Sequence, residues 1–162
     1  NDIKKFEREI KLNLKEVDIN SLIKERTEEM IRGVKTKIEF DIEPSLPNIL
    51  ADGKELTAVF QELVRNAIGF MEEKGKLTIK TSRAEDYIKI EFSDTGPGFS
   101  EEAMKHLFEP LFTTNPQGTG LGLATVKKII EAHKGTTNAE NIKEGGARFI
   151  IHLPIKTKGG KD

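Results

Sequence analysis

Several residue types and patterns are missing from this chain of 162 residues, and each absence excludes a class of protein. It has no cysteine, which excludes a disulfide framework, a zinc–thiolate site and a cysteine nucleophile. No apolar run approaches the roughly 18 residues of a membrane-spanning helix. The 26 basic and 27 acidic side chains leave a net charge of -1, which argues against a nucleic-acid or polybasic membrane binder. What is present is 36% hydrophobic residues, enough to build the core of one ordinary domain.

Hydrophobic periodicity predicts strands and helices along most of the chain. Helices are expected from Asn20 or Ser21 to about Arg32, from an Asp52 cap to about Glu73, and from Gly120 to about His133. Strands are expected over residues 12–17, 37–42, 49–51, 77–82, 87–93, 136–139 and 147–153. Residues 95–119 show little regular pattern, and such a long loop in a compact domain is usually a functional lid. The order predicts a sandwich in which one mixed sheet carries helices on one face.

The helix expected after Asp52 carries two polar residues one turn apart, Glu62 and Asn66. On a helical wheel they share a face beside the apolar stripe. A carboxylate and a carboxamide together suit Mg²⁺, which often takes only one or two protein ligands when phosphates supply the rest. A polar face turned to solvent explains the same spacing, so the pair by itself does not decide between the two.

Two glycine-rich segments bracket the expected lid. In the segment Asp94-Thr95-Gly96-Pro97-Gly98, the carboxylate can accept a hydrogen bond from an exocyclic amine such as that of adenine. Its glycines allow a planar ligand close to the backbone. The segment Gly118-Thr119-Gly120-Leu121-Gly122-Leu123 leads into a helix, whose free N–H groups and positive end form an anion site. Its spacing is neither the dinucleotide-binding fingerprint nor a P-loop. A plain turn and a plain helix start remain alternatives.

In this order, the motifs resemble the ATP-binding catalytic domain of sensor histidine kinases, which belong to a superfamily with gyrase, mismatch-repair and chaperone ATPases. The resemblance covers about residues 17–154. Residues 62–67 are similar to the N box, 94–98 to the first glycine box, 108–114 to the F box, 118–123 to the second glycine box and 145–154 to the closing strand. The resemblance implies the Bergerat fold, an α+β two-layer sandwich. In that fold a mixed, mostly antiparallel sheet packs against three helices and carries an ATP lid.

The resemblance also implies a site for ATP and Mg²⁺. Asn66 is expected to ligate the metal, Asp94 to bind the adenine amine, and Phe70 to flank the base. Glu62 is the expected catalytic residue, which orients the attacking imidazole or accepts its proton. The complete nucleotide-binding set implied in this way is Asn66, Phe70, Asp94, Gly96, Gly98, Gly118, Thr119, Gly120, Leu121, Gly122 and Leu123.

Four positions depart from the family pattern. Many of these kinases carry Asn where Glu62 stands, and Glu is similar instead to the gyrase-type and mitochondrial protein-kinase branches. Gly69 and Asn115 occupy positions where Lys is frequent, and Ala147 replaces a Thr near the base. These departures bear on nucleotide affinity and on the contacts to the γ-phosphate.

None of the three histidines has the setting of a phosphoacceptor. His106 falls in the lid, His133 on the apolar face of a helix and His152 in a strand. We therefore expect the acceptor to lie on a separate domain. Residues 1–11 would be the end of its last helix or a linker, 12–155 the catalytic domain and 156–162 a polar tail.

The expected function is transfer of the γ-phosphoryl group of Mg-ATP to a histidine of the dimerisation and phosphoacceptor domain of the same kinase. That domain would in turn feed the receiver domain of a response regulator. Alternatives are another ATPase or Ser/Thr-directed kinase of the superfamily, or a nucleotide-sensing docking module without transfer. No nucleic-acid partner is expected. The chain is expected to be cytoplasmic and monomeric, within a homodimeric parent, and a membrane anchor on that parent is compatible with this expectation.

Overall fold

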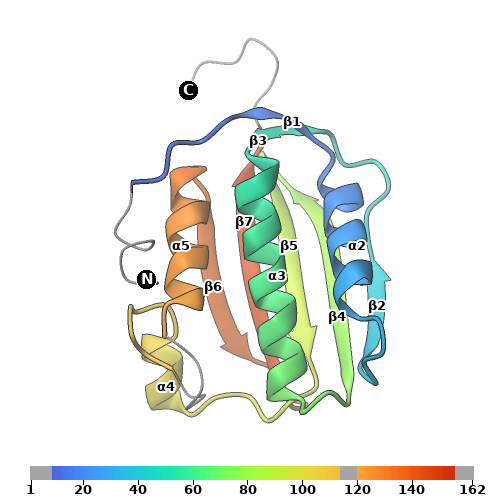
Figure 1. The fold of residues 1–162 in the computed structure, drawn as a ribbon, viewed down its shortest axis with the longest axis vertical. Coiled ribbons are helices and arrows are strands. Elements are labelled where there is room, and N and C mark those ends of the chain that lie inside the picture. Colours follow the sequence, from blue (N-terminus) through green and yellow to red (C-terminus); the bar gives the residue numbers. More distant parts are fainter. Residues whose placement is uncertain (1–8, 114–119, 156–162) are drawn as a thin grey trace.

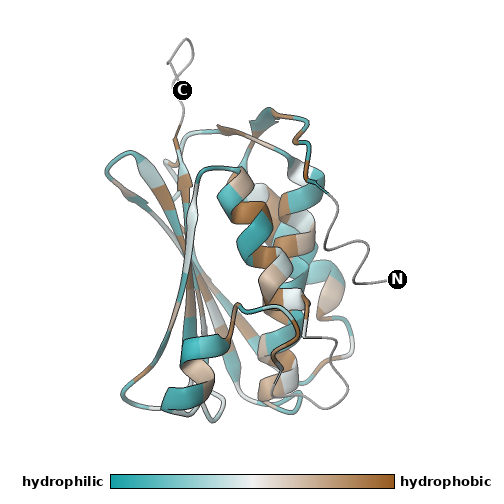
Figure 2. Ribbon diagram, turned by 90° about the vertical axis from the view of Figure 1, so that its left-hand side faces the viewer, coloured by the Kyte–Doolittle hydropathy of each residue, from teal (hydrophilic) through white to brown (hydrophobic). Residues whose placement is uncertain are grey.

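A five-stranded sheet with helices on one face forms the body of the protein (Figures 1 and 2). The computed structural model describes residues 9–113 and 120–155. The strands in spatial order are β2 (Lys37–Asp41), β4 (Lys76–Ala84), β5 (Tyr87–Asp94), β7 (Ala147–Pro154) and β6 (Thr136–Asn141). The β2–β4 pair is parallel and the other three pairs are antiparallel. The covering helices are α2 (Ile19–Met30), α3 (Gly53–Phe70) and α5 (Gly122–Ala132).

A second, two-stranded sheet closes one end of the molecule (Figure 1). In it β1 (Lys15–Val17) pairs antiparallel with β3 (Ile49–Ala51), directly before α3 begins. The carboxylate of Asp52 then caps α3 by accepting from the N–H groups of Lys54 and Glu55 at 3.1 and 3.2 Å. This confirms the predicted cap, which satisfies donors that the first helical turn leaves free.

The core lies between the sheet and the helices because each strand alternates and each helix carries one apolar stripe. In β5, Ile88, Ile90 and Phe92 are buried, while the residues between them face outward. In α3 the buried stripe is Leu56, Val59, Phe60, Leu63, Val64 and Ala67. The α+β two-layer sandwich and its mixed, mostly antiparallel sheet are therefore confirmed, and the expected three helices agree roughly with the four helices of the described residues.

The segment expected to be an irregular lid contains a helix, so that part of the prediction was wrong. Helix α4 (Glu101–His106) is six residues long, and the Ser100 hydroxyl caps it by accepting from the Ala103 N–H at 3.0 Å. A helix this short makes too few turns to show a hydrophobic period. The expected second glycine box and lid lie partly outside the described residues, because residues 114–119 are not described. The same holds for the expected helix end at residues 1–8 and the polar tail at 156–162.

Element boundaries differ by a few residues from the predicted ones. The helix α3 ends at Phe70 rather than about Glu73, and α5 starts at Gly122 rather than Gly120. Glu72 and Glu73 adopt positive φ values of 54 and 64°, which ends the helix without a glycine. Within residues 9–113 and 120–155, no helix combines the length and the apolar character that crossing a membrane would require.

Candidate functional site

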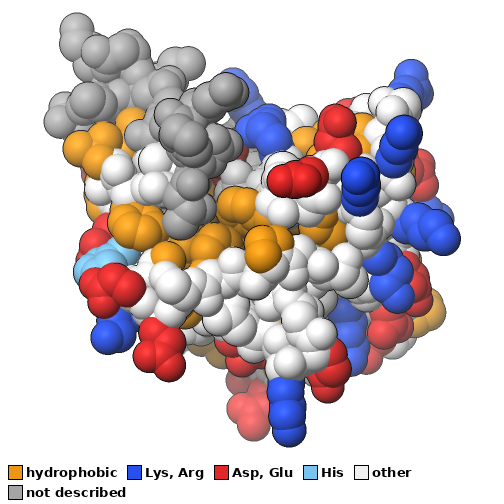
Figure 3. Space-filling view, turned by 90° about the horizontal axis from the view of Figure 1, so that it is seen from below, with side chains coloured by type: hydrophobic (Ala, Val, Ile, Leu, Met, Phe, Trp, Pro, Cys, Tyr) orange, Lys and Arg blue, Asp and Glu red, His pale blue; other side chains and the backbone are white. Residues whose placement is uncertain are grey.

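The predicted site residues that the structure describes gather at one end of the sandwich. The C-terminal ends of β5 and α3 and the start of α5 all lie at the lower end of the molecule in Figure 1. Seen from that end, hydrophobic side chains form a band across the middle of the surface (Figure 3). Partly buried aromatic residues that pack against the core include Phe70, Phe99 and Phe108. The site therefore combines an apolar surface with the polar groups described next.

Asp94, the last residue of β5, is a buried carboxylate with one unused oxygen. The residue is 2% exposed, and its Oδ1 accepts from the N–H of Gly96 at 2.9 Å and of Ala147 at 3.2 Å. Its Oδ2 is buried and has no hydrogen-bond partner among the described residues. Burial raises the pKa of Asp94, and the two backbone hydrogen bonds only partly oppose that effect. A buried acceptor without a partner costs free energy, so this oxygen is suited to receive an N–H donor from a ligand.

Three aromatic residues near the end of β5 pack against one another. Phe70 and Phe99 meet edge to face with their centroids 5.0 Å apart, and Phe99 makes a similar contact with Phe149 at 6.2 Å. The Phe70 carbonyl oxygen lies 3.4 Å from where a side chain on Gly96 would begin. The fold thus brings together Phe70, Asp94 and Gly96. A site for a flat base next to a hydrogen-bond acceptor would require this arrangement.

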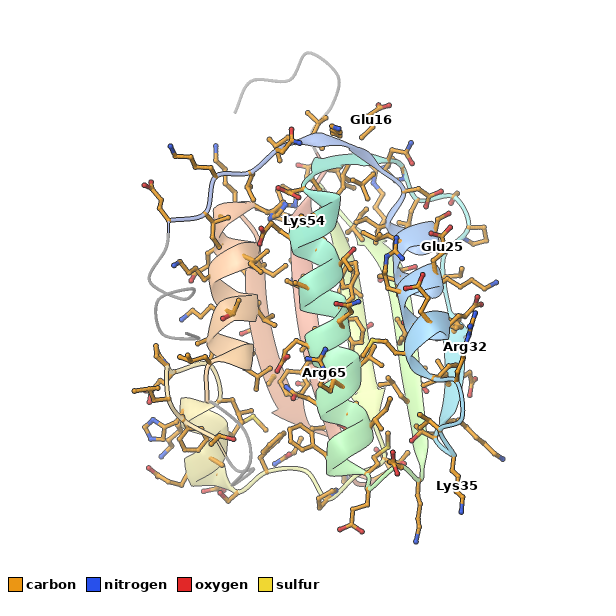
Figure 4. All side chains as sticks on the ribbon, in the orientation of Figure 1. Glu16, Glu25, Arg32, Lys35, Lys54 and Arg65 are labelled. Carbon is orange, nitrogen blue, oxygen red and sulfur yellow. The ribbon has the colours of Figure 1, made fainter. Side chains whose placement is uncertain are left out.

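Glu62 lies on α3 against the start of α5. Its Oε2 accepts from the Arg65 guanidinium at 2.8 Å, and its side chain is 23% exposed. Its Oε1 lies so close to Gly122 that any side chain at that position would collide with the carboxylate. Packing against the Glu62 carboxylate therefore explains why position 122 is a glycine. Figure 4 shows Arg65 on the lower half of α3. The structure brings Glu62 into contact with the second glycine box, some sixty residues away in sequence.

Asn66 follows Glu62 by one helical turn and is half-buried. Its carboxamide forms no hydrogen bond with the residues that the structure describes, so its oxygen is available for a metal ion or a ligand. Within the described ranges, no group of three or more His, Cys, Asp or Glu side chains could hold a metal by itself. Mg²⁺ fits this donor set only if a bound phosphate supplies further oxygens, because one carboxamide is an incomplete coordination shell.

The described part of the second glycine box comprises Gly120 to Leu123. The Gly120 carbonyl accepts from the Leu111 N–H at 2.7 Å, which ties the start of this box to the F box. Leu121 is buried and precedes α5 as its N-cap without a side-chain capping bond, and Leu123 is half-buried. Gly118 and Thr119, also predicted to contact the nucleotide, lie outside the described residues.

The three histidines take different places. His133 is buried, donates from Nδ1 to the Ile129 carbonyl at 2.9 Å and accepts at Nε2 from the Asp52 N–H at 3.0 Å. Its burial agrees with the apolar position expected for it, and both of its ring nitrogens have hydrogen-bond partners. His106 in α4 is flanked by Glu109 at 2.7 Å and Glu102 at 3.0 Å. These hydrogen bonds, with that to Glu109 the largest cause, raise the pKa of His106.

The histidine of β7, His152, lies on the outer face of the sheet, where its ring meets that of Tyr87 edge to face at 6.2 Å. It sits far along β7 from Ala147, at the opposite end of the strand from the site.

Two site residues were not found from the sequence. Arg65 holds Glu62, and its spacing of three residues along a helix is a usual ion-pair spacing that could have revealed it. Met71 lies beneath the first glycine box, where its sulfur is 3.4 Å from the Thr95 nitrogen and 3.5 Å from the Thr95 hydroxyl. No sequence signal marks a methionine for this place, since its contact depends on how α3 meets the end of β5.

Comparison with protein families places this geometry among known proteins. Residues 51–157 match the family described as histidine kinase-, DNA gyrase B-, and HSP90-like ATPase. The sensor histidine kinase ZraS of Escherichia coli O157:H7 is 35% identical over 147 residues, which are 89% of this chain and 32% of ZraS. The chain thus spans about a third of the length of the curated relatives it matches.

Solved structures show the same fold. The catalytic domain of the histidine kinase ThkA matches 88% of this chain and 96% of its own length, with 34% identity and a TM-score of 0.80. ThkA has also been solved in complex with the response regulator protein TrrA. Full-length ShkA in complex with AMPPNP matches 98% of this chain and 35% of its own length, with 30% identity and a TM-score of 0.86. The chain therefore has the fold of a histidine kinase catalytic domain.

Proposed function

Because this chain belongs to the family of histidine kinase-, DNA gyrase B- and HSP90-like ATPases, we propose that it binds Mg-ATP and transfers the γ-phosphoryl group to a histidine. The acceptor histidine lies on a separate dimerisation and phosphoacceptor domain, and the phosphoryl group then passes to a response regulator. The observation that carries the proposal is the buried Oδ2 of Asp94, which has no partner among the described residues, at the end of the molecule that also holds the Phe70–Phe99 ring pair. The relatives named as sensor histidine kinases and the AMPPNP complex of ShkA support it.

Adenine recognition follows from the state of Asp94. Its Oδ1 is occupied by two backbone N–H groups, which leaves Oδ2 as the acceptor for the exocyclic amine of the base. Guanine presents a carbonyl oxygen at the corresponding position and would meet the carboxylate with repulsion. Phe70 and Gly96 flank the plane of the base, and Gly98 belongs to the same loop.

The phosphate end of the nucleotide lies toward α5 in this proposal. The backbone of Gly118, Gly120 and Gly122 wraps the phosphates, while Thr119, Leu121 and Leu123 line the site. The N–H groups at the start of α5 face this end and favour anions. Asn66 holds Mg²⁺ through its carboxamide oxygen, and a bound Mg²⁺ neutralises charge on the phosphates.

Glu62 is the residue that acts on the nucleophile. Arg65 holds one of its oxygens, and the other points to the start of α5, where the phosphates are expected. From this position the carboxylate orients the imidazole of the docked acceptor and takes up its proton as the nitrogen attacks the γ-phosphorus in line. The bond from that phosphorus to the β,γ-bridging oxygen breaks at the same time, and ADP is the leaving group. Phosphoryl transfer depends mainly on such positioning and charge stabilisation.

The proposal includes the wider arrangement. Residues 12–155 form the catalytic domain, residues 1–11 the end of the preceding helix or linker, and residues 156–162 a tail. The chain acts in the cytoplasm as a monomeric unit of a homodimeric kinase. The ThkA–TrrA complex supports the response regulator as a partner.

A related ATPase reaction is the second candidate, favoured by Glu62. A carboxylate poised at the start of α5 can activate a water molecule as readily as an imidazole. Hydrolysis and histidine transfer then differ only in which nucleophile occupies the place beside Glu62.

The test mixes the chain with γ-labelled Mg-ATP and a separately produced phosphoacceptor domain of a sensor histidine kinase. We expect acid-labile, base-stable label on the acceptor domain and none on this chain. An acceptor domain whose histidine is replaced by glutamine is the matched control. Nucleotide binding without any transfer would favour a docking module, label on serine a Ser/Thr-directed kinase, and phosphate release without acceptor an ATPase.

A further inference from the structure

Asn141, a residue outside the family motifs, forms hydrogen bonds with the loop that follows Asp94. Asn141 is the last residue of β6 and lies at the surface, at the same end of the sheet as Asp94 (Figure 1). Its Oδ1 accepts from the Phe99 N–H at 2.9 Å, and its Nδ2 donates to the Phe99 carbonyl at 2.7 Å. The side chain thus pairs with both backbone groups of one residue, as a neighbouring strand would.

The backbone conformation of Gly98 and its lack of a side chain make room for this contact. Its φ is +74°, a conformation that residues with a side chain rarely adopt. A Cβ at this position would lie 2.8 Å from Asn141 Oδ1 and 3.2 Å from the Gly146 carbonyl oxygen. Glycine at position 98 is therefore required for the loop to approach the β6–β7 hairpin, whether or not a ligand is bound.

The same hairpin holds both ends of the loop. At the near end, the Ala147 N–H at the start of β7 donates to Asp94 Oδ1 at 3.2 Å. At the far end, Asn141 fixes the Phe99 backbone, and the Phe99 ring packs against Phe70 at 5.0 Å. Fixing the backbone of Phe99 therefore also fixes a ring next to the predicted base site.

We propose that Asn141 is a positioning residue for the nucleotide, which holds residues 95–99 in their binding conformation before the ligand arrives. This inference rests on the proposed function, since it assumes that the loop contacts a nucleotide base. Asn141 is expected to touch neither the base nor the phosphates. It acts through Phe99, because a loop that is already ordered loses less conformational entropy when a ligand binds.

The test compares Asn141→Ala with Asn138→Ala. Asn138 lies on the same strand, is also exposed, and forms no hydrogen bond with the described residues, so it is a matched control. Calorimetry measures the Kd for Mg-ADP, and hydrogen exchange measures the Phe99 amide without nucleotide. We expect Asn141→Ala to raise the Kd about tenfold, as two lost surface hydrogen bonds imply. The Phe99 amide should exchange at least about tenfold faster. Asn138→Ala should change neither.

Two further readouts separate positioning from general structure. Asn141→Asp keeps an acceptor for the Phe99 N–H but loses the donor, so we expect an intermediate rise in Kd. In the transfer assay, Asn141→Ala should raise the KM for ATP and leave kcat within about twofold, because the reacting groups are untouched. The midpoint of thermal unfolding should shift by no more than about 2–4 °C, since both bonds lie at the surface.

The outcomes distinguish this inference from the proposed function. An unchanged Kd in Asn141→Ala, while wild-type protein binds Mg-ADP, would overturn the positioning role and leave the proposed function standing. Unchanged exchange of the Phe99 amide would show that the two hydrogen bonds do not order the loop, and would also overturn it. Absence of nucleotide binding by the wild-type protein would instead defeat the proposed function, and this inference with it.

Discussion

The substitution Asp94→Asn changes one functional atom of the proposed base site and little else. The two N–H donors from Gly96 and Ala147 bind Oδ1, which asparagine retains. The unpartnered Oδ2 becomes an NH2 group, which donates rather than accepts. An adenine amine would then face another donor. The variant therefore tests the hydrogen bond to the base without removing those that hold the loop.

The expected loss of affinity follows from burial. Asp94 is 2% exposed, so a hydrogen bond from its carboxylate to a ligand amine is shielded from water. A hydrogen bond to a charged group is worth about 1.5–3 kcal/mol. The Kd for Mg-ADP should therefore rise by roughly 10- to 150-fold. The preference for ADP over GDP should shrink, because the new NH2 group can donate to the guanine carbonyl oxygen.

The stability of the nucleotide-free protein should change in the opposite direction. Burial raises the pKa of Asp94 above 3.8, so the folded state holds this proton more tightly than the unfolded state. Stability therefore falls as pH rises from 3.8 through the folded pKa, and above the folded pKa the cost of the buried charge is fully present. Asparagine carries no charge and avoids this cost. We expect the variant without nucleotide to be at least as stable as the wild type.

Isothermal titration calorimetry with Mg-ADP and Mg-GDP gives the two affinities, and urea denaturation gives the free energy of unfolding. Ser93→Ala, on the outward face of the same strand, removes a hydrogen bond from the Arg148 guanidinium at 3.1 Å but leaves the Asp94 carboxylate in place, so it is a control for handling and folding. A Kd for Mg-ADP within twofold of the wild type would refute the assignment of Asp94 to the base. A loss of nucleotide-free stability above about 1 kcal/mol would instead show that its free oxygen has a structural role.

Three other predictions concern different parts of the molecule. Glu62→Gln should slow single-turnover phosphotransfer by on the order of 10²-fold and leave the nucleotide Kd within a few-fold of the wild type. Asn66→Ala should instead weaken the binding of Mg-ATP itself. Equal losses of affinity in both variants would contradict these separate roles of Glu62 and Asn66. The NMR titration of His106 should have a midpoint above 6.5. The contribution of its ion pairs to stability is therefore present below pH 6.5 and is lost as pH rises through the folded pKa. A midpoint that stays unchanged in Glu109→Gln would contradict this prediction. His133→Ala should lower the free energy of unfolding, measured in urea, by about 2–4 kcal/mol, because two buried hydrogen bonds and a packed ring are lost. A decrease below about 1 kcal/mol would refute the stabilising role of these contacts.

Much of the fold could be predicted from local patterns. The alternation in residues 77–82 and 87–93 and the apolar stripe that follows Asp52 are set by periods of two and of 3.6 residues, which are properties of the backbone itself. The four family boxes were equally readable, because each is a short run of consecutive residues. Helix α4 was missed because its six residues are too few to display a period, and its Ser100 cap has meaning only once a helix is expected there.

The sequence by itself therefore determined the elements other than α4, the layer arrangement and the residues to examine. Only the tertiary structure decided which groups meet and which remain without a partner. The free Oδ2 of Asp94, the contact of Glu62 with Gly122 and the pairing of Asn141 with Phe99 join positions distant along the chain. Each depends on how strands and helices pack, since a hydrogen bond requires a distance and an angle that no local pattern specifies.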